Sequence, residues 1–181
     1  CLTAMDIRQL TCPSFEADDI LGTMARRCEE AGVYALLVTG DRDSMQLVSE
    51  TSHVLYTKRG VSDVVRYTPE KVLEDFGVTP AQIPDLKGLM GDASDNIPGV
   101  AGVGEKTALD LLHRFESVEK IYAALDELDI RESVRTKLRA GEESAKLSFD
   151  LATIRTNAPI DFSPEDARFS GVFGGALYAV F

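Results

Sequence analysis

The sequence predicts an α/β fold, in which a parallel sheet with flanking helices is joined to a helical subdomain. Strands and helices alternate over residues 7–67, which is the pattern of a parallel sheet covered by helices. Beyond residue 67, capped helices follow one another without a strand between them. We therefore divide the chain into a sheet region (residues 1–67), a helical region (residues 68–155) and a C-terminal extension (residues 156–181).

The sheet region is predicted from its apolar pattern. Residues 33–39 form a nearly continuous apolar run, which is typical of a strand buried on both faces. In the helix before it, Ile20, Met24 and Cys28 recur every fourth residue, and Gly32 is a typical helix stop. In order, we expect a strand at 7–11, this helix at 15–31, the strand at 33–39, a short helix at 44–48, a strand at 53–58 and an edge strand at 64–67.

The helical region is predicted from its helix caps. Thr68 before Pro69 is a typical helix start, and Gly77 is a typical stop. The further helices are expected at residues 79–90, 105–115, 117–128, 132–139 and 142–154. We expect residues 156–162 to be extended and residues 169–181 to be a glycine-rich apolar tail.

The composition is that of an ordinary globular protein, with 44% hydrophobic and 27% charged residues. No apolar run reaches the roughly 20 residues of a membrane helix. The three cysteines lack metal-binding spacing, so we expect reduced thiols in a cytoplasmic protein. His53 and His113 have no acidic or nucleophilic partner in sequence, and we expect them to be surface or packing residues.

Acidic residues are concentrated in three places. The net charge of −11 argues against a simple electrostatic DNA clamp, but seven of the 30 acids are clustered and the other 23 face 19 bases. Cations bound to the clusters would offset their charge, so a polyanionic partner stays compatible with the sequence. The clusters are Glu16, Asp18 and Asp19 at a predicted helix start, Asp41 and Asp43 at a predicted strand end, and Asp92 and Asp95 in a glycine-flanked loop.

Each cluster alone has an ordinary structural interpretation, because acids favour helix starts and aspartates are common in turns. Helical geometry places Asp18 roughly opposite Glu16, so Asp18 either lies behind the direct ligands or reaches round the helix start. Three clusters around one sheet edge are harder to explain without a cation, because close carboxylates repel one another. Together they predict a site for Mg²⁺, which prefers oxygen ligands and can act as a pair about 4 Å apart on a phosphodiester.

A glycine turn follows the third cluster and predicts a phosphate-binding element. Gly99 and Lys106 are one residue too far apart for a Walker A loop, and no strand precedes them. A helix-hairpin-helix turn fits better, because its backbone amides contact phosphates without reading sequence. A glycine-rich connection with no ligand is the other interpretation, but it gives Lys106 no role. The candidate DNA contacts are Gly102, Gly104, Lys106 and Thr107.

Three motifs occur in a highly specific order: Phe15-Glu16-Ala17-Asp18-Asp19-Ile20-Leu21-Gly22, Thr39-Gly40-Asp41-Arg42-Asp43 and Gly91-Asp92-Ala93-Ser94-Asp95-Asn96-Ile97-Pro98-Gly99-Val100. They closely resemble the motifs of the 5′ nuclease (5′-3′ exonuclease) domain of bacterial DNA polymerase I, which belongs with the flap endonucleases on a PIN-like fold. The resemblance covers nearly the whole chain. It implies that residues 1–67 are the C-terminal part of the nuclease core and that residues 156–181 lead toward a following domain.

The resemblance also implies an activity, cofactors and partners. A family member would be a Mg²⁺- or Mn²⁺-dependent, two-metal 5′ nuclease that removes RNA primers and 5′ flaps in replication and repair. Its substrates would be flapped, nicked or gapped DNA, and its parent chain would carry proofreading and polymerase domains as a cytoplasmic, nucleoid-associated monomer. The seven clustered acids match the family's metal site, and Gly102, Gly104 and Lys106 match its helix-hairpin-helix element, which often holds K⁺.

Part of the family pattern has no counterpart here. In the family, a strand with a metal-binding aspartate and an arch of basic and aromatic residues precede the position of Cys1, so we expect the chain to be a fragment. We expect Asp19, Asp41 and Asp43 to bind metal directly, and the other four acids to be further ligands or to hold water. A non-catalytic DNA-binding module and a PIN-type ribonuclease stay open as alternatives.

Overall fold

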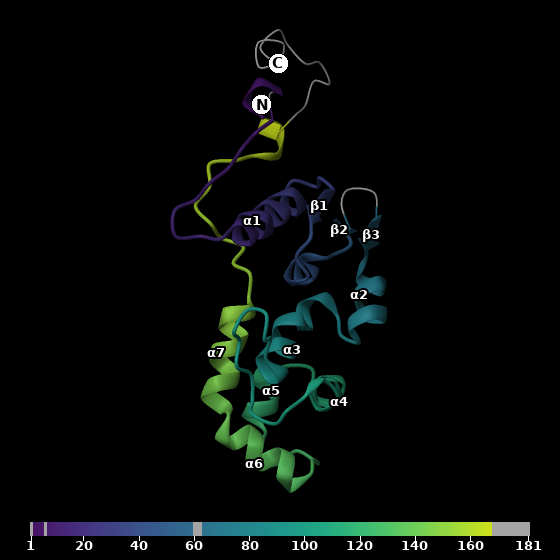
Figure 1. Cartoon of the computed structure of the whole chain (residues 1–181), viewed down its shortest axis with the longest axis vertical. Coiled ribbons are helices and arrows are strands. Elements are labelled where there is room, and N and C mark those ends of the chain that lie inside the picture. Colours follow the sequence, from purple (N-terminus) through teal and green to yellow (C-terminus); the bar gives the residue numbers. More distant parts are fainter. Residues whose placement is uncertain (1, 6, 60–62, 168–181) are drawn as a thin grey trace.

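The structure, a computed structural model, describes residues 2–5, 7–59 and 63–167. Figure 1 shows an elongated molecule, in which the strands and α1 (Ala17–Glu30) occupy the upper half and α3–α7 occupy the lower half. The sheet region and the helical region are therefore stacked end to end. No helix in the described part of the chain is both long and apolar enough to span a membrane.

The described sheet has three strands in the order β1 (Ala35–Thr39), β2 (Ser52–Arg59) and β3 (Asp63–Tyr67). β1 and β2 are parallel, with Leu37 opposite Val54. β3 is antiparallel to β2, because the few residues between the two strands are too short for a crossover connection. The predicted α/β class is confirmed, with a sheet that is mixed and not purely parallel.

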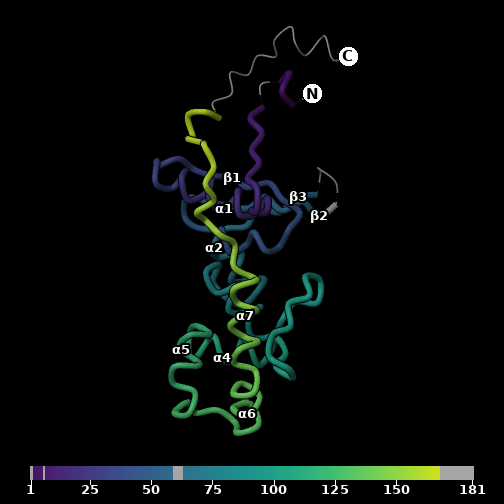
Figure 2. Tube along the Cα trace, turned by 90° about the vertical axis from the view of Figure 1, so that its left-hand side faces the viewer, coloured from purple at the N-terminus to yellow at the C-terminus, as the bar shows by residue number. Residues whose placement is uncertain are grey.

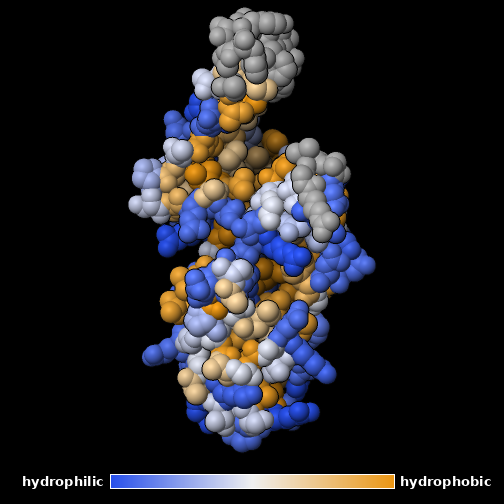
Figure 3. All heavy atoms as spheres, viewed as in Figure 1, coloured by the Kyte–Doolittle hydropathy of each residue, from blue (hydrophilic) through white to orange (hydrophobic). Residues whose placement is uncertain are grey.

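α1 covers one face of the sheet. Ala25 of α1 lies in the same buried core as Ala35 and Leu37 of β1, whereas the alternate residues Leu36 and Val38 are 47% and 61% exposed. The prediction that this strand is buried on both faces is wrong for the described structure, because α1 packs on one face only. Figure 3 shows orange apolar atoms reaching the surface in the upper half of the molecule.

Residues 7–11 do not form the predicted strand. They pair with no strand in the described chain, and Leu10 and Cys12 pack against Ala158, Ile160 and Phe162. Apolar side chains hold this segment in place, so its sequence pattern resembles a strand although no backbone ladder forms. Figure 2 shows the later segment, coloured green to yellow, running from α7 up past α1.

The helical region follows the predicted caps. Thr68 Oγ1 accepts a hydrogen bond from the backbone N–H of Lys71 at 3.3 Å, and Gly77 ends the first helix with a φ of 71°. The helix predicted to begin at residue 79 is divided into a 3-10 turn and α3. The helices are α2 (Pro69–Phe76), α3 (Ile83–Met90), α4 (Glu105–Phe115), α5 (Val118–Ala123), α6 (Glu132–Ala140) and α7 (Glu142–Ala152).

α5 is shorter than predicted and ends at Ala123 instead of near residue 128. Arg135 of α6 donates hydrogen bonds to the carbonyl oxygens of Leu125 and Leu128, the latter at 2.7 Å. These carbonyls are thus satisfied outside a helix, while both leucine side chains stay buried. A side chain of the next helix, which the caps of α5 do not reveal, therefore supports the non-helical segment after α5.

α3 and α7 form the closest helix pair. A Cβ atom added to Gly88 would lie 3.2 Å from Phe149 Cβ and 3.3 Å from the carbonyl oxygen of Ala145. The missing side chain lets the two backbones approach closely. This contact fixes α3, which leads directly into the loop that carries Asp92 and Asp95.

Candidate metal centre and nucleic-acid interface

A cleft of about 850 Å³ lies between the sheet region and the helical region. β1 ends at Thr39 and delivers Asp41 and Asp43 to one side of it, and the loop after α3 delivers Asp92 and Asp95 to the other. Two of the three predicted clusters therefore meet at the carboxyl end of a strand, as the sequence pattern indicates.

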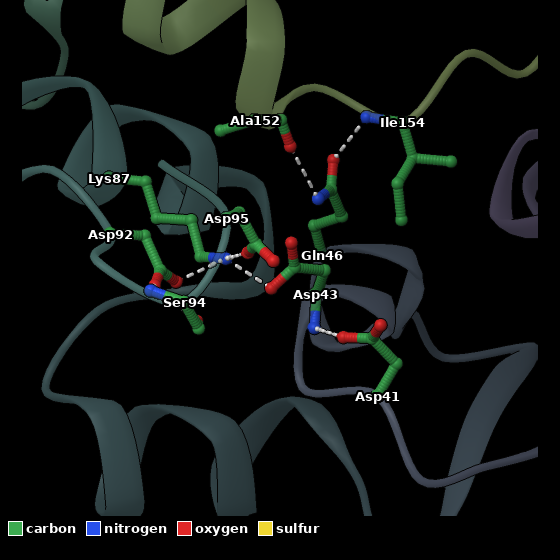
Figure 4. Close-up of polar contacts among 9 residues, drawn as sticks. All are labelled: Asp41, Asp43, Gln46, Lys87, Asp92, Ser94, Asp95, Ala152 and Ile154. Carbon is green, nitrogen blue, oxygen red and sulfur yellow. Dashed lines mark hydrogen bonds and ion pairs between the residues drawn. The ribbon is translucent and has the colours of Figure 1, made fainter. Parts of the chain in front are cut away.

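Three carboxylates converge in this cleft. One oxygen each from Asp43, Asp92 and Asp95 lies within 4.8 Å of the other two. Figure 4 shows these side chains pointing toward one another from the start of the 3-10 helix η2 (Asp43–Leu47) and from the loop after α3. Such a set of oxygen donors fits a hard divalent cation such as Mg²⁺ or Mn²⁺.

Lys87 of α3 lies at the centre of the three carboxylates. Its Nζ atom is 2.7 Å from Asp92 Oδ2, 3.3 Å from Asp95 Oδ2 and in hydrogen-bond contact with Asp43 Oδ1. The lysine side chain is only 13% exposed. Three carboxylates and one ammonium group carry a net charge of −2, which one divalent cation would neutralise.

The loop between α3 and α4 holds its aspartates through its own backbone. The N–H and C=O groups of Asp92 and Ile97 bond each other at 2.9 and 2.8 Å, and the N–H of Ser94 donates to Asp92 Oδ1 at 2.9 Å. The loop ends cross so closely that a Cβ on Gly99 would lie 2.2 Å from the backbone nitrogen of Gly91. The glycines of this motif are therefore needed to build the site.

The electrostatics of the cluster are uneven. Burial raises the pKa of Asp92, but hydrogen bonds from Lys87 and Ser94 outweigh this effect and lower the pKa to about 2. Burial raises the pKa of Asp43 above its ordinary value, and Lys87 offsets this only in part. Burial lowers the pKa of Lys87, but its bonds to the two aspartates raise it overall. The ammonium group of Lys87 is therefore the positive charge that offsets the carboxylates of this cluster.

The acids of α1 lie in an adjoining hollow of about 240 Å³, which is lined by Glu16, Asp18, Asp19 and the shared residue Asp43. Burial raises the pKa of Asp18, followed by the charges of Asp41 and Asp43. Asp18 lines the same hollow as Asp43, and its role as a further ligand or a water-holding group stays a prediction.

Asp19 has a different set of partners. Its Oδ2 atom accepts the backbone N–H of Glu16 at 3.1 Å, and its Oδ1 atom accepts the backbone N–H of Arg155 at 2.8 Å. Glu16 is the N-cap residue of α1. Asp19 therefore ties the start of α1 to the segment after α7, and its direct ligation of metal stays a prediction.

Gln46 completes this arrangement and was not found from the sequence. Its Nε2 donates to the carbonyl of Ala152 at 2.9 Å, and its Oε1 accepts the N–H of Ile154 at 2.9 Å, as Figure 4 shows. Lys87 was also missed. The only signal in the sequence is the position of this lysine four residues before Gly91. The structure adds that its neighbours Leu86 and Gly88 are buried.

The predicted helix-hairpin-helix turn joins α3 to α4 beside the cleft. Val100 and Val103 anchor it and are 2% and 4% exposed, whereas Gly102, Gly104 and Lys106 are exposed. A Cβ on Gly104, the N-cap of α4, would meet nothing within 4 Å. The first N–H groups of α4 have no partner within the helix, so this open end is suited to a phosphate.

The turn and the start of α4 border two hollows. Glu105, the first residue of α4, lines the same cleft as Asp43, Asp92 and Asp95. Lys106 and Thr107 line a separate groove of about 520 Å³ with Arg114 and Arg131. The four predicted DNA contacts therefore lie around one helix start, next to the acidic cleft.

The two histidines lie outside these sites, as the sequence indicates. His53 Nδ1 accepts a hydrogen bond from Arg66 at 2.9 Å, and its ring packs edge-on against Tyr34. His113 bonds the carbonyl oxygen of Gly77.

An acidic cleft suited to a divalent cation, beside a glycine turn on this fold, is typical of a class of nucleases. A family model described as "5′-3′ exonuclease, N-terminal resolvase-like domain" matches residues 1–77, and one described as "5′-3′ exonuclease, C-terminal SAM fold" matches residues 78–173. The chain belongs to the 5′-3′ exonuclease family.

Known relatives agree with this assignment. The chain is 48% identical to DNA polymerase I of Bacillus caldotenax over 93% of its length, and 44% identical to that of Bacillus subtilis over 99%. It spans about a fifth of the length of these relatives, 19% and 20%. It is thus related to one part of a much longer polymerase.

Solved structures show the same fold. A structure titled "Divalent metal ions (zinc) bound to T5 5′-exonuclease" matches 81% of this chain and 53% of that chain, with a TM-score of 0.69 and 25% identity. The catalytic core of Rad2 in complex with DNA matches 90% of this chain and 57% of that chain, with a TM-score of 0.54 and 17% identity. The second likeness supports the fold alone.

Proposed function

We propose that this chain is the metal- and DNA-binding part of a structure-specific 5′ nuclease that hydrolyses phosphodiesters in DNA and RNA-primer strands with two Mg²⁺ or Mn²⁺ ions. The observation that carries the proposal is the convergence of Asp43, Asp92 and Asp95 from two regions of the chain. The neighbouring hollow shares Asp43 and adds the acids of α1, so the carboxylates suffice for more than one ion. The zinc-bound T5 5′-exonuclease supports divalent metal use by this fold.

Each group of acids would have its own role. Asp43, Asp92 and Asp95 would hold one metal ion, and Asp41 with the α1 acids would hold the second ion or orient a water molecule. Bound ions activate a water molecule and stabilise the leaving oxygen. Lys87 keeps the aspartates together by pairing with each of them, and the turn at Gly104 binds the phosphate backbone beside the cleft. Because no base contact is implied, we expect recognition of DNA shape.

The proposal extends to the longer protein of which this chain would be a part. The polymerase relatives support a parent chain with a polymerase domain. We propose in addition that this parent chain carries a proofreading domain and acts on flapped, nicked or gapped duplexes as a monomer in the cytoplasm, at the nucleoid. The proposal includes K⁺ at the turn, because a backbone carbonyl oxygen such as that of Gly102 keeps a second lone pair beside the hydrogen bond it accepts from Lys137.

The test is cleavage of a labelled 5′-flap duplex by this chain in Mg²⁺ and in EDTA. We expect Mg²⁺-dependent cutting near the junction and a loss of at least about 100-fold in Asp41→Asn and Asp43→Asn. Asp126→Asn is the matched control, because it removes the same charge from an exposed residue on the helical region, and we expect unchanged cleavage.

Three outcomes would change the proposal. Binding of the flap duplex without cleavage would make residues 1–181 a non-catalytic DNA-binding module by themselves and would assign the nuclease function to the parent chain. Faster cutting of single-stranded RNA than of flap DNA would favour the PIN-type ribonuclease. Equal cleavage by wild type and Asp43→Asn would contradict the assignment of the metal centre.

A further inference from the structure

The basic side chains of the helical region fall into two groups, those that pair with a carboxylate and those that do not. The paired residues are Lys71, Lys87, Arg114, Lys120, Arg135, Arg139 and Lys146. Within the described residues, no carboxylate pairs with the other bases of residues 68–155, which are Lys106, Arg131, Lys137 and Arg155. Lys137 donates to the carbonyl of Gly102, and Lys106 and Arg131 line one groove near the same turn. The charge that the protein leaves unpaired is therefore concentrated around the start of α4.

The groove lies between α4 and α6 and has a volume of about 520 Å³. Lys106 comes from the first turn of α4, and Arg131 is the N-cap residue of α6. Both residues are exposed, whereas Leu111, which also lines the groove, is only 1% exposed. Charged groups thus stand at the rim, above an apolar floor.

Arg114 holds the two sides of the groove together. Its guanidinium group donates a hydrogen bond to the carbonyl oxygen of Asp129, two residues before Arg131. The same group lies 4.8 Å from the centre of the Phe115 ring. Arg114 therefore ties α4 to the segment that leads into α6, and this contact sets the position of Arg131 across from α4.

The lining of the groove is positively charged, although the chain as a whole carries a net charge of −11. Lys106, Arg114 and Arg131 line it, and Asp110 is the only acid among the described residues that does so. Asp110 lies 3.5 Å from Arg114, so its charge is already offset by a neighbour. Three positive groups and one negative group suit an anion as the ligand.

The groove continues the phosphate-binding surface that we propose for the turn. Gly104 is the N-cap of α4, and Lys106 and Thr107 follow it into the groove. One strand of duplex DNA has a phosphate about every 3.4 Å along the helix axis, so a phosphate at the start of α4 has close neighbours on the same strand. Arg131 caps α6 without a side-chain hydrogen bond, so its guanidinium group is available to such a neighbour.

We propose that the groove between α4 and α6 binds a second backbone phosphate of the duplex, next to the phosphate at the start of α4, with Arg131 as its main contact. A guanidinium group can donate two parallel hydrogen bonds to one phosphate. The inference rests on the proposed role of the turn in DNA binding. It extends the DNA-binding surface beyond the helix-hairpin-helix motif to α6.

The experiment is fluorescence anisotropy of the 181-residue chain with a labelled, unflapped duplex in EDTA, over a series of KCl concentrations. Arg131→Gln should weaken binding about 5- to 10-fold and lower the salt slope by about one phosphate contact. Arg131→Lys should bind more tightly than Arg131→Gln and more weakly than the wild type, because it keeps the charge and loses the paired donors. The double variant Arg131→Gln with Lys106→Gln should lower the slope by about two contacts, because the two residues serve different phosphates.

Arg139→Gln is the matched control, because it removes the same charge from the same helix at a residue that pairs with Asp126 at 2.5 Å. We expect it to keep the wild-type salt slope. An equal loss in Arg139→Gln and Arg131→Gln would overturn the inference, because it would indicate a general effect of charge. A double variant that loses only one contact would also overturn it, because one shared phosphate would explain both residues.

The outcomes separate this inference from the proposed function. Binding that is lost in Lys106→Gln but kept in Arg131→Gln would refute the groove and leave the turn as a DNA contact. A wild type that does not bind the duplex would refute both the groove and the DNA-binding part of the proposed function. Because EDTA prevents cleavage, a chain that binds through Arg131 but never cuts in Mg²⁺ would refute the nuclease proposal alone.

Discussion

The candidate metal centre and the predicted helix-hairpin-helix turn are adjacent, yet each is held in its shape by a different kind of interaction. The metal centre gathers three like charges around Lys87, and its half-buried aspartates have perturbed pKa values. The turn is anchored by the buried side chains of Val100 and Val103 and by backbone hydrogen bonds. Charge thus shapes the first site and packing shapes the second. Changes in charge should affect mainly the first, and steric changes mainly the second.

The largest expected effect is that of Gly99→Ala. The added Cβ would lie 2.2 Å from the backbone nitrogen of Gly91, at a φ of 62° that disfavours alanine. Backbone cannot move aside as a flexible side chain can, so we expect a loss of about 3 kcal/mol or more, or no folded protein. Chemical denaturation measures this loss. A stable Gly99→Ala variant would show that the close contact between the backbones at Gly91 and Gly99 is not essential for folding.

Lys87→Met tests the charge that holds the metal centre. Without the ammonium group, the three carboxylates have no counterion, and we expect the metal-free protein to lose about 1–3 kcal/mol. Added Mn²⁺ should restore more stability to this variant than to the wild type. Lys71→Met, which removes exposed ion pairs on α2, is the control and should cost less stability than Lys87→Met. Equal losses in the two variants would contradict the role of Lys87.

The pH dependence of the metal-free protein should show the same interaction. The pKa of Asp92 is about 2 in the folded chain, below the ordinary value of 3.8, so its contribution is fully present above pH 4 and is lost as the pH falls toward 2. We expect the stability advantage of the wild type over Lys87→Met to shrink by about 1–2 kcal/mol over this range. Chemical denaturation of both proteins in EDTA at several pH values measures this difference in the free energy of unfolding. A difference that does not change with pH would contradict the prediction.

Gly104→Ala should have the smallest effect on stability and is the counterpart of Gly99→Ala. Gly104 has a φ of −99° and open space where a Cβ would lie, so we expect a change of less than about 0.5 kcal/mol. Duplex binding should nevertheless weaken, because a methyl group would stand between the helix start and a phosphate. Unchanged binding would indicate that the duplex does not approach the turn at Gly104.

Many elements of these two regions could be predicted from the local sequence. Thr68, Pro69 and Gly77 mark their helix correctly because caps act within a few residues. The clustered acids and the glycine turn were found because each motif is contiguous. Residues 7–11 were predicted wrongly because side-chain packing against residues 158–162 produces the same apolar pattern as a strand.

Long-range contacts were not accessible in the same way. Lys87, Gln46 and Lys137 each act on partners that the fold brings to them from 44, 106 and 35 residues away. The helical wheel does not show that Asp18 shares a hollow with Asp43, because this depends on how α1 packs in the fold. The sequence thus identifies the acidic residues of the site, and the fold identifies the residues that hold those acids in position.

The hydrogen bonds of Gln46 and Asp19 have a consequence for the order of synthesis. Gln46 is bonded to residues 106 and 108 positions later, and Asp19 to one 136 positions later. All seven acids therefore leave the ribosome before the segment that fixes α1 and η2 to the end of α7. A nascent chain interrupted before residue 152 would contain every acidic motif but would lack the hydrogen bonds that tie α1 and η2 to the end of α7. Synthesis of residues 152–155, and not translation of the motifs, is therefore the event that fixes the acids of α1 relative to the rest of the site.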